Sequence, residues 1–349
     1  MPTYDTAQLV FLPVGAIVII VGLFGNACTL IAITKFKHLR SPVNILLANI
    51  AASDLMCLLI SMPDMIEYYS GTWVLGDAVC RIHGALLEVS YTVCVFSLTA
   101  VAFERYWAMC RPFGIIHSKQ KVKHVVGLIW LIGNLLSAPL YYGWGTKTVE
   151  GEGTICGSIG WTSDQGYIIY YAVQTIAIYV IPLVLIIITH LRIYFYLRKK
   201  SCHLPPPKPS PQSTIVKPKC LEFARHSTAE AMTLERIKNS QKQRNRSVIR
   251  ILVVVTATFF LLWTPFIFLR LLRIYVPVPI LLWRTSQFLI LVMCSINFFV
   301  YSYMSSDFRK VFQKFVARSK KDGDGEEDRV RNSMRLSQLG NVNYRANTR

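Results

Sequence analysis

The sequence predicts an all-α membrane protein, a seven-transmembrane helix bundle followed by a short amphipathic cytoplasmic helix. Of its 349 residues, 53% are hydrophobic and only 16% are charged, whereas charged residues make up about 25% of an average soluble domain. The apolar residues gather in seven stretches of about 20 or more, the length that crosses a bilayer. Basic residues concentrate in alternate connections between them, which is typical of a multi-pass membrane protein.

The seven apolar stretches form the expected transmembrane domain, residues 9–304. A large soluble protein would need amphipathic helices to cover such segments, and the sequence supplies none. A multi-span transporter, the alternative from another functional class, would show an internal repeat, and the sequence has none. The expected spans are Leu9 to Ile33, Val43 to Tyr68, Val79 to Cys110, Val122 to Tyr142, Tyr167 to Leu197, Val248 to Ile274 and Val278 to Met304.

The basic residues also predict the orientation of the chain. All but five of the 38 lysines and arginines lie in the connections and the tail on the side of the C-terminus. Because cytoplasmic loops carry the excess of positive charge, we expect a cell-membrane protein with a cytoplasmic C-terminus and an extracellular N-terminus, residues 1–8. A nucleic-acid partner is not expected, since it would need the net charge of +19 on one folded face.

Three cytoplasmic segments are expected outside the bundle. Residues 201–245 are polar and contain a proline-rich run, which favours a flexible, extended loop. Residues 305–317 place phenylalanines on one helical face and basic residues on the other, as in a helix that lies on membrane lipids. Residues 318–349 are polar and charged, which predicts a disordered tail.

Two of the nine cysteines are expected on the outer, oxidising side of the membrane. Cys80 opens the third span and Cys156 lies in the second outer loop, so a disulfide between them would tie that loop to the helix end. The other cysteines fall in spans or cytoplasmic segments, where they stay reduced or fill space as small apolar groups.

Polar side chains within the spans are functional or paired, because hydrocarbon makes an unpaired polar group costly. Asp54 in span two is one of them, and Glu104 with Arg105 stands near the cytoplasmic end of span three. There the acid can hold the arginine until another partner competes for it. The alternative for the latter two is a pair of charges that reach the membrane interface.

Several short motifs follow one another along the chain: Gly25-Asn26, Leu47 to Asp54, Trp73 to Gly76, Glu104-Arg105-Tyr106, Trp130, Pro182, Phe259 with Trp263-Thr-Pro265, and Asn297 to Tyr301. In this order they resemble the motifs of the rhodopsin-like G-protein-coupled receptors, and the resemblance extends up to Phe315. The resemblance implies an extracellular ligand, a heterotrimeric G protein, arrestin and receptor kinases as partners, and no catalytic residue, metal or cofactor. It assigns activation and G-protein coupling to Asp54, Glu104, Arg105, Tyr106, Pro182, Phe259, Pro265, Asn297 and Tyr301.

The sequence departs from the family pattern at two places. Phe298 replaces the proline of the family's Asn-Pro-x-x-Tyr motif, which puts the kink of span seven in doubt. Around Asp54, the positions that offer oxygen ligands to a sodium ion in relatives are Cys94, Met293 and Cys294. Because hard cations prefer oxygen, we expect no tight sodium site.

Two ligand classes remain open from the sequence. The second outer loop, Gly143 to Trp161, resembles the corresponding loop of opsins, but Leu291 stands where a Schiff base with retinal needs a lysine. An opsin-related receptor for a non-covalent apolar ligand is therefore one alternative.

The other ligand class is a peptide. An amine receptor would be expected to carry an aspartate at Leu87, whereas the acid here is Glu88. Together with Asp64 and Arg270 it resembles the pocket of the ghrelin, motilin and neuromedin peptide receptors. Glu88 and Arg270 are expected to interact, either to orient a ligand or merely to neutralise each other. Trp263 and Gln287 complete the predicted ligand-binding set.

Overall fold

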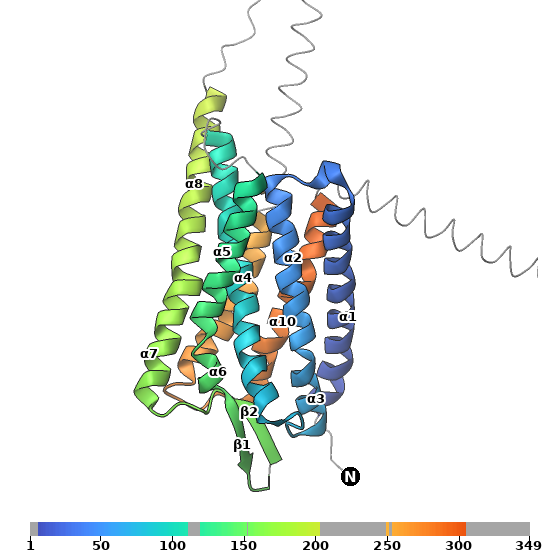
Figure 1. Cartoon of the computed structure of the whole chain (residues 1–349), viewed down its shortest axis with the longest axis vertical. Coiled ribbons are helices and arrows are strands. Elements are labelled where there is room, and N and C mark those ends of the chain that lie inside the picture. The colour runs from blue at the N-terminus through green and yellow to red at the C-terminus, as the bar shows by residue number, and fades with distance from the viewer. Residues whose placement is uncertain (1–5, 111–118, 152, 203–248, 251–252, 305–349) are drawn as a thin grey trace, which may run out of the picture. The chain divides into compact units, whose positions relative to one another are not determined.

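The computed structural model describes residues 6–110, 119–151, 153–202, 249–250 and 253–304. Seven helices in these ranges are long and apolar enough to cross a membrane, and they pack side by side as a bundle (Figure 1). The expected fold class is thus confirmed. The predicted amphipathic helix 305–317, the tail 318–349 and nearly all of the loop 201–245 lie outside the described residues.

The elements follow one another as α1 (Thr6–Lys35), η1 (Lys37–Leu39), α2 (Pro42–Ile60), α3 (Met62–Ser70), α4 (Gly76–Cys110), α5 (Lys119–Ser137), α6 (Leu140–Gly143), β1 (Gly145–Val149), β2 (Gly153–Gly157), α7 (Asp164–Thr175), η2 (Ile176–Val180), α8 (Ile181–Cys202), the sixth spanning helix (Val253–Leu272) and α10 (Ile280–Met304). The compact unit of the bundle ends at Val300; the described residues after it complete the last turn of α10.

Spans two and five, each predicted as one helix, have a local irregularity near a proline. Pro63 has no N–H to offer the preceding turn, and at Ser61 the chain changes from α2 to α3, with the Ser61 hydroxyl donating to the Cys57 carbonyl over 2.8 Å. Ahead of Pro182, the segment η2 widens into a π-helix, in which the N–H of Ile181 bonds the carbonyl of Ile176. Such wide turns accommodate an extra residue within a helix.

The core of the bundle is built around α4, which packs against α2, α5 and α8. Buried polar side chains add specific links between these helices. Asn49 donates to Ser97 over 2.8 Å and accepts from the indole of Trp130 over 2.9 Å, so one amide joins α2, α4 and α5. Asn26 of α1 donates to the Cys294 carbonyl of α10 over 2.9 Å. The side chains of Asn49 and Asn26 thereby find partners on other helices, which offsets the cost of polar groups in hydrocarbon.

The connection between α6 and α7 contains a feature that the sequence did not predict. Strands β1 and β2 form an antiparallel hairpin in which Thr146 stands opposite Cys156. The hairpin lies at the end of the bundle where α4 begins (Figure 1). We call this the disulfide end, and the opposite end, where α4 finishes near Arg105, the Arg105 end.

Candidate functional site

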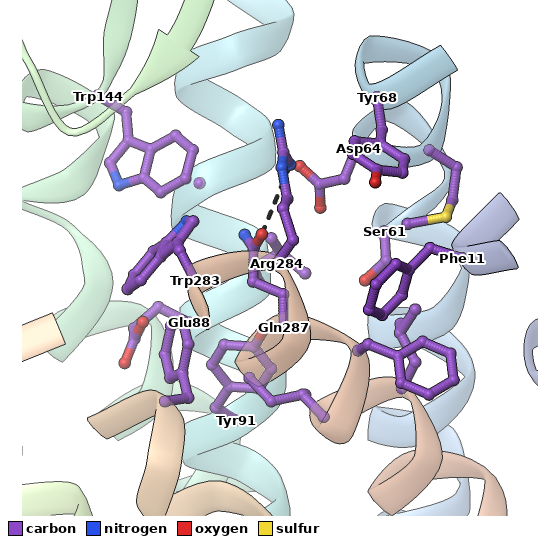
Figure 2. Close-up of a pocket in the computed structure, with 17 residues that line it drawn as sticks. Phe11, Ser61, Asp64, Tyr68, Glu88, Tyr91, Trp144, Trp283, Arg284 and Gln287 are labelled. Atoms are coloured by element: carbon purple, nitrogen blue, oxygen red, sulfur yellow. Dashed lines mark hydrogen bonds between the residues drawn. The ribbon is translucent and has the colours of Figure 1, made fainter. Parts of the chain in front are cut away.

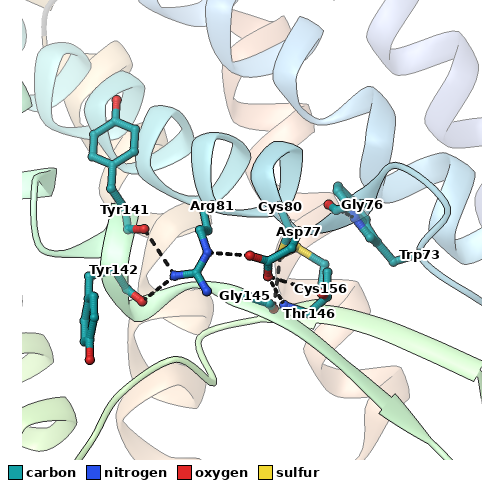
Figure 3. Close-up of polar contacts among 10 residues, drawn as sticks. All are labelled: Trp73, Gly76, Asp77, Cys80, Arg81, Tyr141, Tyr142, Gly145, Thr146 and Cys156. Atoms are coloured by element: carbon teal, nitrogen blue, oxygen red, sulfur yellow. Dashed lines mark hydrogen bonds and ion pairs between the residues drawn. A yellow bond between two sulfur atoms is a disulfide. The ribbon is translucent and has the colours of Figure 1, made fainter.

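The hairpin is fastened to the first turns of α4 by one covalent and several polar contacts (Figure 3). Cys80 and Cys156 form the predicted disulfide, with their Cα atoms 5.7 Å apart. The carboxylate of Asp77 accepts from the Thr146 N–H over 2.8 Å and from Arg81 Nε over 2.6 Å. Together these contacts hold the hairpin and its flanking residues in a fixed place over the helix ends.

Beneath this hairpin, at the disulfide end, lies a cavity between spans one, two, three and seven (Figure 2). It encloses about 810 Å³ including its mouth, and its lining is mainly apolar. A mainly apolar lining with a few polar side chains is typical of a ligand site. We call it the Asp64 cavity. Its polar side chains are Ser61, Asp64, Glu88, Arg284 and Gln287, and its apolar walls include Phe11, Leu87, Tyr91, Trp144, Phe266, Trp283, Phe288, Ile290 and Leu291.

Three of the five predicted ligand-binding residues line this cavity: Asp64, Glu88 and Gln287. The other two, Trp263 and Arg270, are buried and do not belong to its lining as the structure describes it. Leu291, the residue at the position of the retinal lysine, does line the cavity. An apolar side chain therefore occupies the place where an opsin would present its amine.

Glu88 and Arg270 form the expected ion pair. Nη1 of Arg270 donates to both carboxylate oxygens of Glu88 over 3.2 Å, and the two side chains are only 5% and 7% exposed. The guanidinium also lies over the rings of Tyr171 and Phe266, at 5.0 Å and 5.5 Å. Such stacking adds a cation–π attraction. Arg270, which does not line the cavity, thus compensates the charge of Glu88, which does.

Sequence reasoning did not assign a role in the cavity to Arg284. Its guanidinium lies over the ring of Tyr68 at 5.3 Å, and Nη1 is 3.5 Å from Oε1 of Gln287. The signal was present, because residues three apart share one face of a helix and Gln287 was already a predicted ligand contact.

His83 and Trp144 were also missed, since their partners are remote in sequence. His83 is buried between the rings of Trp73 and Trp144, and its Nε2 lies 3.3 Å from Oδ2 of Asp64. No helical periodicity links these four positions, so only the fold brings them together.

Trp144 owes its position in the cavity wall to Gly84. A Cβ atom at Gly84 would stand only 2.0 Å from Cδ2 of Trp144. We expect Gly84→Val to displace the indole and to lower the free energy of unfolding by about 1–3 kcal/mol, as overpacking does. Thermal unfolding and tryptophan fluorescence of the purified protein measure both effects. Gly127→Val is the matched control, because nothing lies within 4 Å of its added Cβ; equal behaviour of the two variants would contradict the close packing.

One side chain connects the cavity with the centre of the bundle. Tyr91 lines the cavity and its ring lies 6.0 Å from that of Trp263, which is fully buried. Trp263 in turn contacts Phe259 at 5.0 Å and Tyr179 at 5.7 Å. Phe259 and Trp263 thus lie in one cluster of rings to which span five contributes Tyr179, and Pro182 is buried one turn further along span five.

Deeper in the bundle, Asp54 is buried and joined to span seven. Asn297 donates to its Oδ2 over 2.7 Å, and the thiols of Cys94 and Cys294 face the carboxylate. Sulfur ligands suit a hard cation poorly, so these residues do not fit a tight sodium site. Phe298 packs onto α1 beside Gly25, where a Cβ would come within 2.6 Å of it, and α10 continues as one helix through Tyr301.

At the Arg105 end, Glu104 and Arg105 form an ion pair. Nε of Arg105 donates to Oε2 of Glu104 over 2.6 Å, and the acid is the more buried partner. The neighbouring ring of Tyr106 contacts Trp107. The arginine is thus held by an adjacent acid and keeps part of its surface open, so a competing partner can reach it.

Residues 25–301 match the family model described as 7 transmembrane receptor (rhodopsin family). Similar proteins include the red-sensitive opsin of Gallus gallus and the medium-wave-sensitive opsin 1 of Sciurus carolinensis, each 31% identical over 52% of this chain. The matched segment spans only 51% of the length of each of these two relatives. The red-sensitive opsin of Xenopus laevis is 25% identical over 93% of this chain and 82% of its own length. By its family match and its seven spanning helices, the chain belongs to the rhodopsin family of seven-transmembrane receptors.

Proposed function

We propose that this receptor binds an extracellular ligand in the Asp64 cavity and activates a heterotrimeric G protein at the Arg105 end. The observation that carries the proposal is the chain of ring contacts from the cavity through Tyr91 to Trp263 and Phe259. A ligand that favours one arrangement of Tyr91 shifts the equilibrium between bundle states through this cluster. Pro265, two residues beyond Trp263, gives the sixth helix a hinge because it cannot donate a helix hydrogen bond.

The proposed orientation places the disulfide end outside the cell membrane and the Arg105 end in the cytoplasm. The distribution of basic residues supports it, as does the disulfide, which forms in an oxidising compartment. Arrestin and receptor kinases are proposed as further cytoplasmic partners on the basis of the family alone.

The first candidate ligand is a peptide, favoured by the acidic and basic side chains in and behind the cavity wall. The second is an apolar molecule held without a covalent bond. It is favoured by the mainly apolar lining and by the opsin relatives, while Leu291 at the cavity removes the amine that covalent retinal needs. Activation by an uncharged apolar molecule alone would select the second candidate.

Replacement of Arg105 by alanine tests the proposed coupling. We expect ligand-driven G-protein activation in cells to fall by at least about tenfold, which is about 1.4 kcal/mol of coupling free energy, because no other group replaces a guanidinium that exchanges partners. Glu104→Gln should instead raise basal activity, since the resting partner loses its charge. Lys121→Ala removes an exposed charge at the same end of the bundle and serves as control. Full activation by Arg105→Ala at normal surface expression would refute the role of this residue.

A further inference from the structure

The charges of the Asp64 cavity are not all compensated within the described residues. Glu88 is neutralised by Arg270 through two contacts of 3.2 Å. The ion-pair contact of Asp64 among the described residues is with the imidazole of His83, at 3.3 Å. Arg284 contacts a ring and an amide oxygen, and among the described residues no carboxylate lies within ion-pair distance of it, while Glu67 interacts with it through charge alone. The cavity therefore presents one acidic and one basic group, Asp64 and Arg284, neither of which is in a direct ion pair with a described arginine, lysine or carboxylate.

These two groups lie on different helices and face the same space. Asp64 projects from α3 and Arg284 from the first turns of α10, and Figure 2 shows the two side chains directed toward each other across the cavity. They do not form an ion pair, and Nε of Arg284 is buried without a hydrogen-bond partner in the described structure. The other acid of α3, Glu67, accepts the Cys156 N–H over 3.3 Å and does not line the cavity.

Each class of ligand satisfies these charges to a different degree. A neutral apolar ligand would cover both groups and leave both unpaired, which is costly in a water-poor site. A simple amine would compensate Asp64 and leave Arg284 buried beside it. A ligand with one ammonium and one carboxylate compensates both, and a guanidinium binds a carboxylate with two parallel hydrogen bonds.

We propose that the Asp64 cavity recognises a small zwitterion with an apolar body, such as an aromatic or aliphatic amino acid or a very short peptide. Its ammonium group binds Asp64 and its carboxylate binds Arg284. The proposal rests on the proposed ligand site and narrows its ligand class. Tyr68 and Gln287 hold the guanidinium in place before the ligand arrives, which lowers the ordering cost of binding.

The remaining walls fit the apolar body of such a ligand. Leu87, Tyr91 and Phe288 also line the cavity and supply apolar and aromatic surface. The indole Nε1 of Trp144 is buried in the wall without a partner among the described residues, so it can donate one further hydrogen bond to a ligand oxygen. Because the Tyr91 ring contacts Trp263, a ligand that binds against Tyr91 also affects the position of Trp263.

Binding is tested on the full-length receptor in lipid nanodiscs, with thermal unfolding as the readout. The probes are L-phenylalanine and L-tryptophan as zwitterions, phenethylamine and tryptamine as cations, their N-acetyl amino acids as anions, and toluene and indole as neutral molecules. A ligand that binds only the folded state raises the unfolding temperature in a concentration-dependent manner. We expect a zwitterion to bind at least about tenfold more tightly than its matched amine or anion.

Substitutions assign the two ends of the ligand. Asp64→Asn and Arg284→Gln should each weaken zwitterion binding at least about tenfold. In Arg284→Gln, the amino acid and its matched amine should bind with the same affinity. In Asp64→Asn, the amino acid should no longer bind more tightly than its N-acetyl form. Asp64→Glu and Arg284→Lys keep the charges and should retain part of the preference, which separates charge recognition from misfolding. Lys147→Gln removes an exposed charge from β1 at the same end of the bundle and should change nothing.

The outcomes separate this proposal from the proposed function. Equal binding of amine and zwitterion to the unaltered receptor, or no stabilisation by either zwitterion at millimolar concentration, overturns the zwitterion site. Unchanged zwitterion binding in both Asp64→Asn and Arg284→Gln overturns it as well. Selective zwitterion binding without G-protein activation in cells would support the site and refute the signalling function.

Discussion

Arg270→Ala is expected to remove most of the folded receptor from the cell surface. The substitution leaves the Glu88 carboxylate buried without the cation that pairs with it in the described structure, and breaking a buried pair in this way costs about 3–5 kcal/mol. A large share of the stability of an ordinary domain would be lost. The measurements are surface labelling of a tagged receptor and thermal unfolding after purification.

The charge-reversed double variant separates pairing from packing. If the two residues pair, Glu88→Arg combined with Arg270→Glu should recover much of the expression that each single reversal loses. Arg273→Ala is the matched control. Arg273 lies three residues after Arg270, is exposed, and has its guanidinium over the ring of Trp283. Normal expression of both single reversals would mean that the two charges act independently, and the comparison with peptide receptors would lose its main support.

Loss of the disulfide is the second large effect that we expect. Cys80 and Cys156 are 76 residues apart, and removal of a native disulfide typically costs about 2–5 kcal/mol. Cys80→Ser should also remove the covalent link of the hairpin to α4, so that hydrogen bonds such as those with Asp77 and Thr72 hold it alone. Ligand binding should weaken together with the unfolding temperature, because Trp144 adjoins β1 and forms part of the cavity wall.

The double variant Cys80→Ser with Cys156→Ser should behave like either single variant, because each removes the same bond. Cys28→Ser is the control, as Cys28 is a free thiol in α1. Peptide mapping of unreduced protein that recovered both outer cysteines as free thiols would contradict the bond and, with it, the assignment of this end to the outside.

Hydropathy sufficed for the seven spans because each is a long apolar run whose length the bilayer dictates. Hydropathy could not locate the break at Ser61 or the wide turn of η2. Pro63 and Pro182 lie within long apolar stretches, and averaging hydropathy along a stretch does not reveal such local irregularities. The sequence did not predict the hairpin, for another reason. Its strands are short and polar. They are held in part by the disulfide and by hydrogen bonds of the Thr154 backbone with the Thr72 hydroxyl and the Trp73 N–H.

The candidate site was predictable only where a resemblance supplied the pairing. Glu88 and Arg270 are 182 residues apart in the chain, and no periodic pattern relates them. The contact of His83 with Asp64 and that of Arg284 with Tyr68 depend on how α3, α4 and α10 lie against one another. Such cross-helix contacts are properties of the packed bundle, and the sequence of each helix specifies only the face on which they occur.

The wide turn at Ile176–Val180 sets the rotational register of span five. An α-helix advances by about 100° per residue, so one additional residue turns the whole of α7 by that angle relative to α8. Tyr171 lies before this turn and covers Arg270. Deletion of a single residue within the turn would restore a uniform helix, rotate Tyr171 away from the guanidinium and present a different row of side chains to the bundle, while hydropathy and span length stayed almost unchanged.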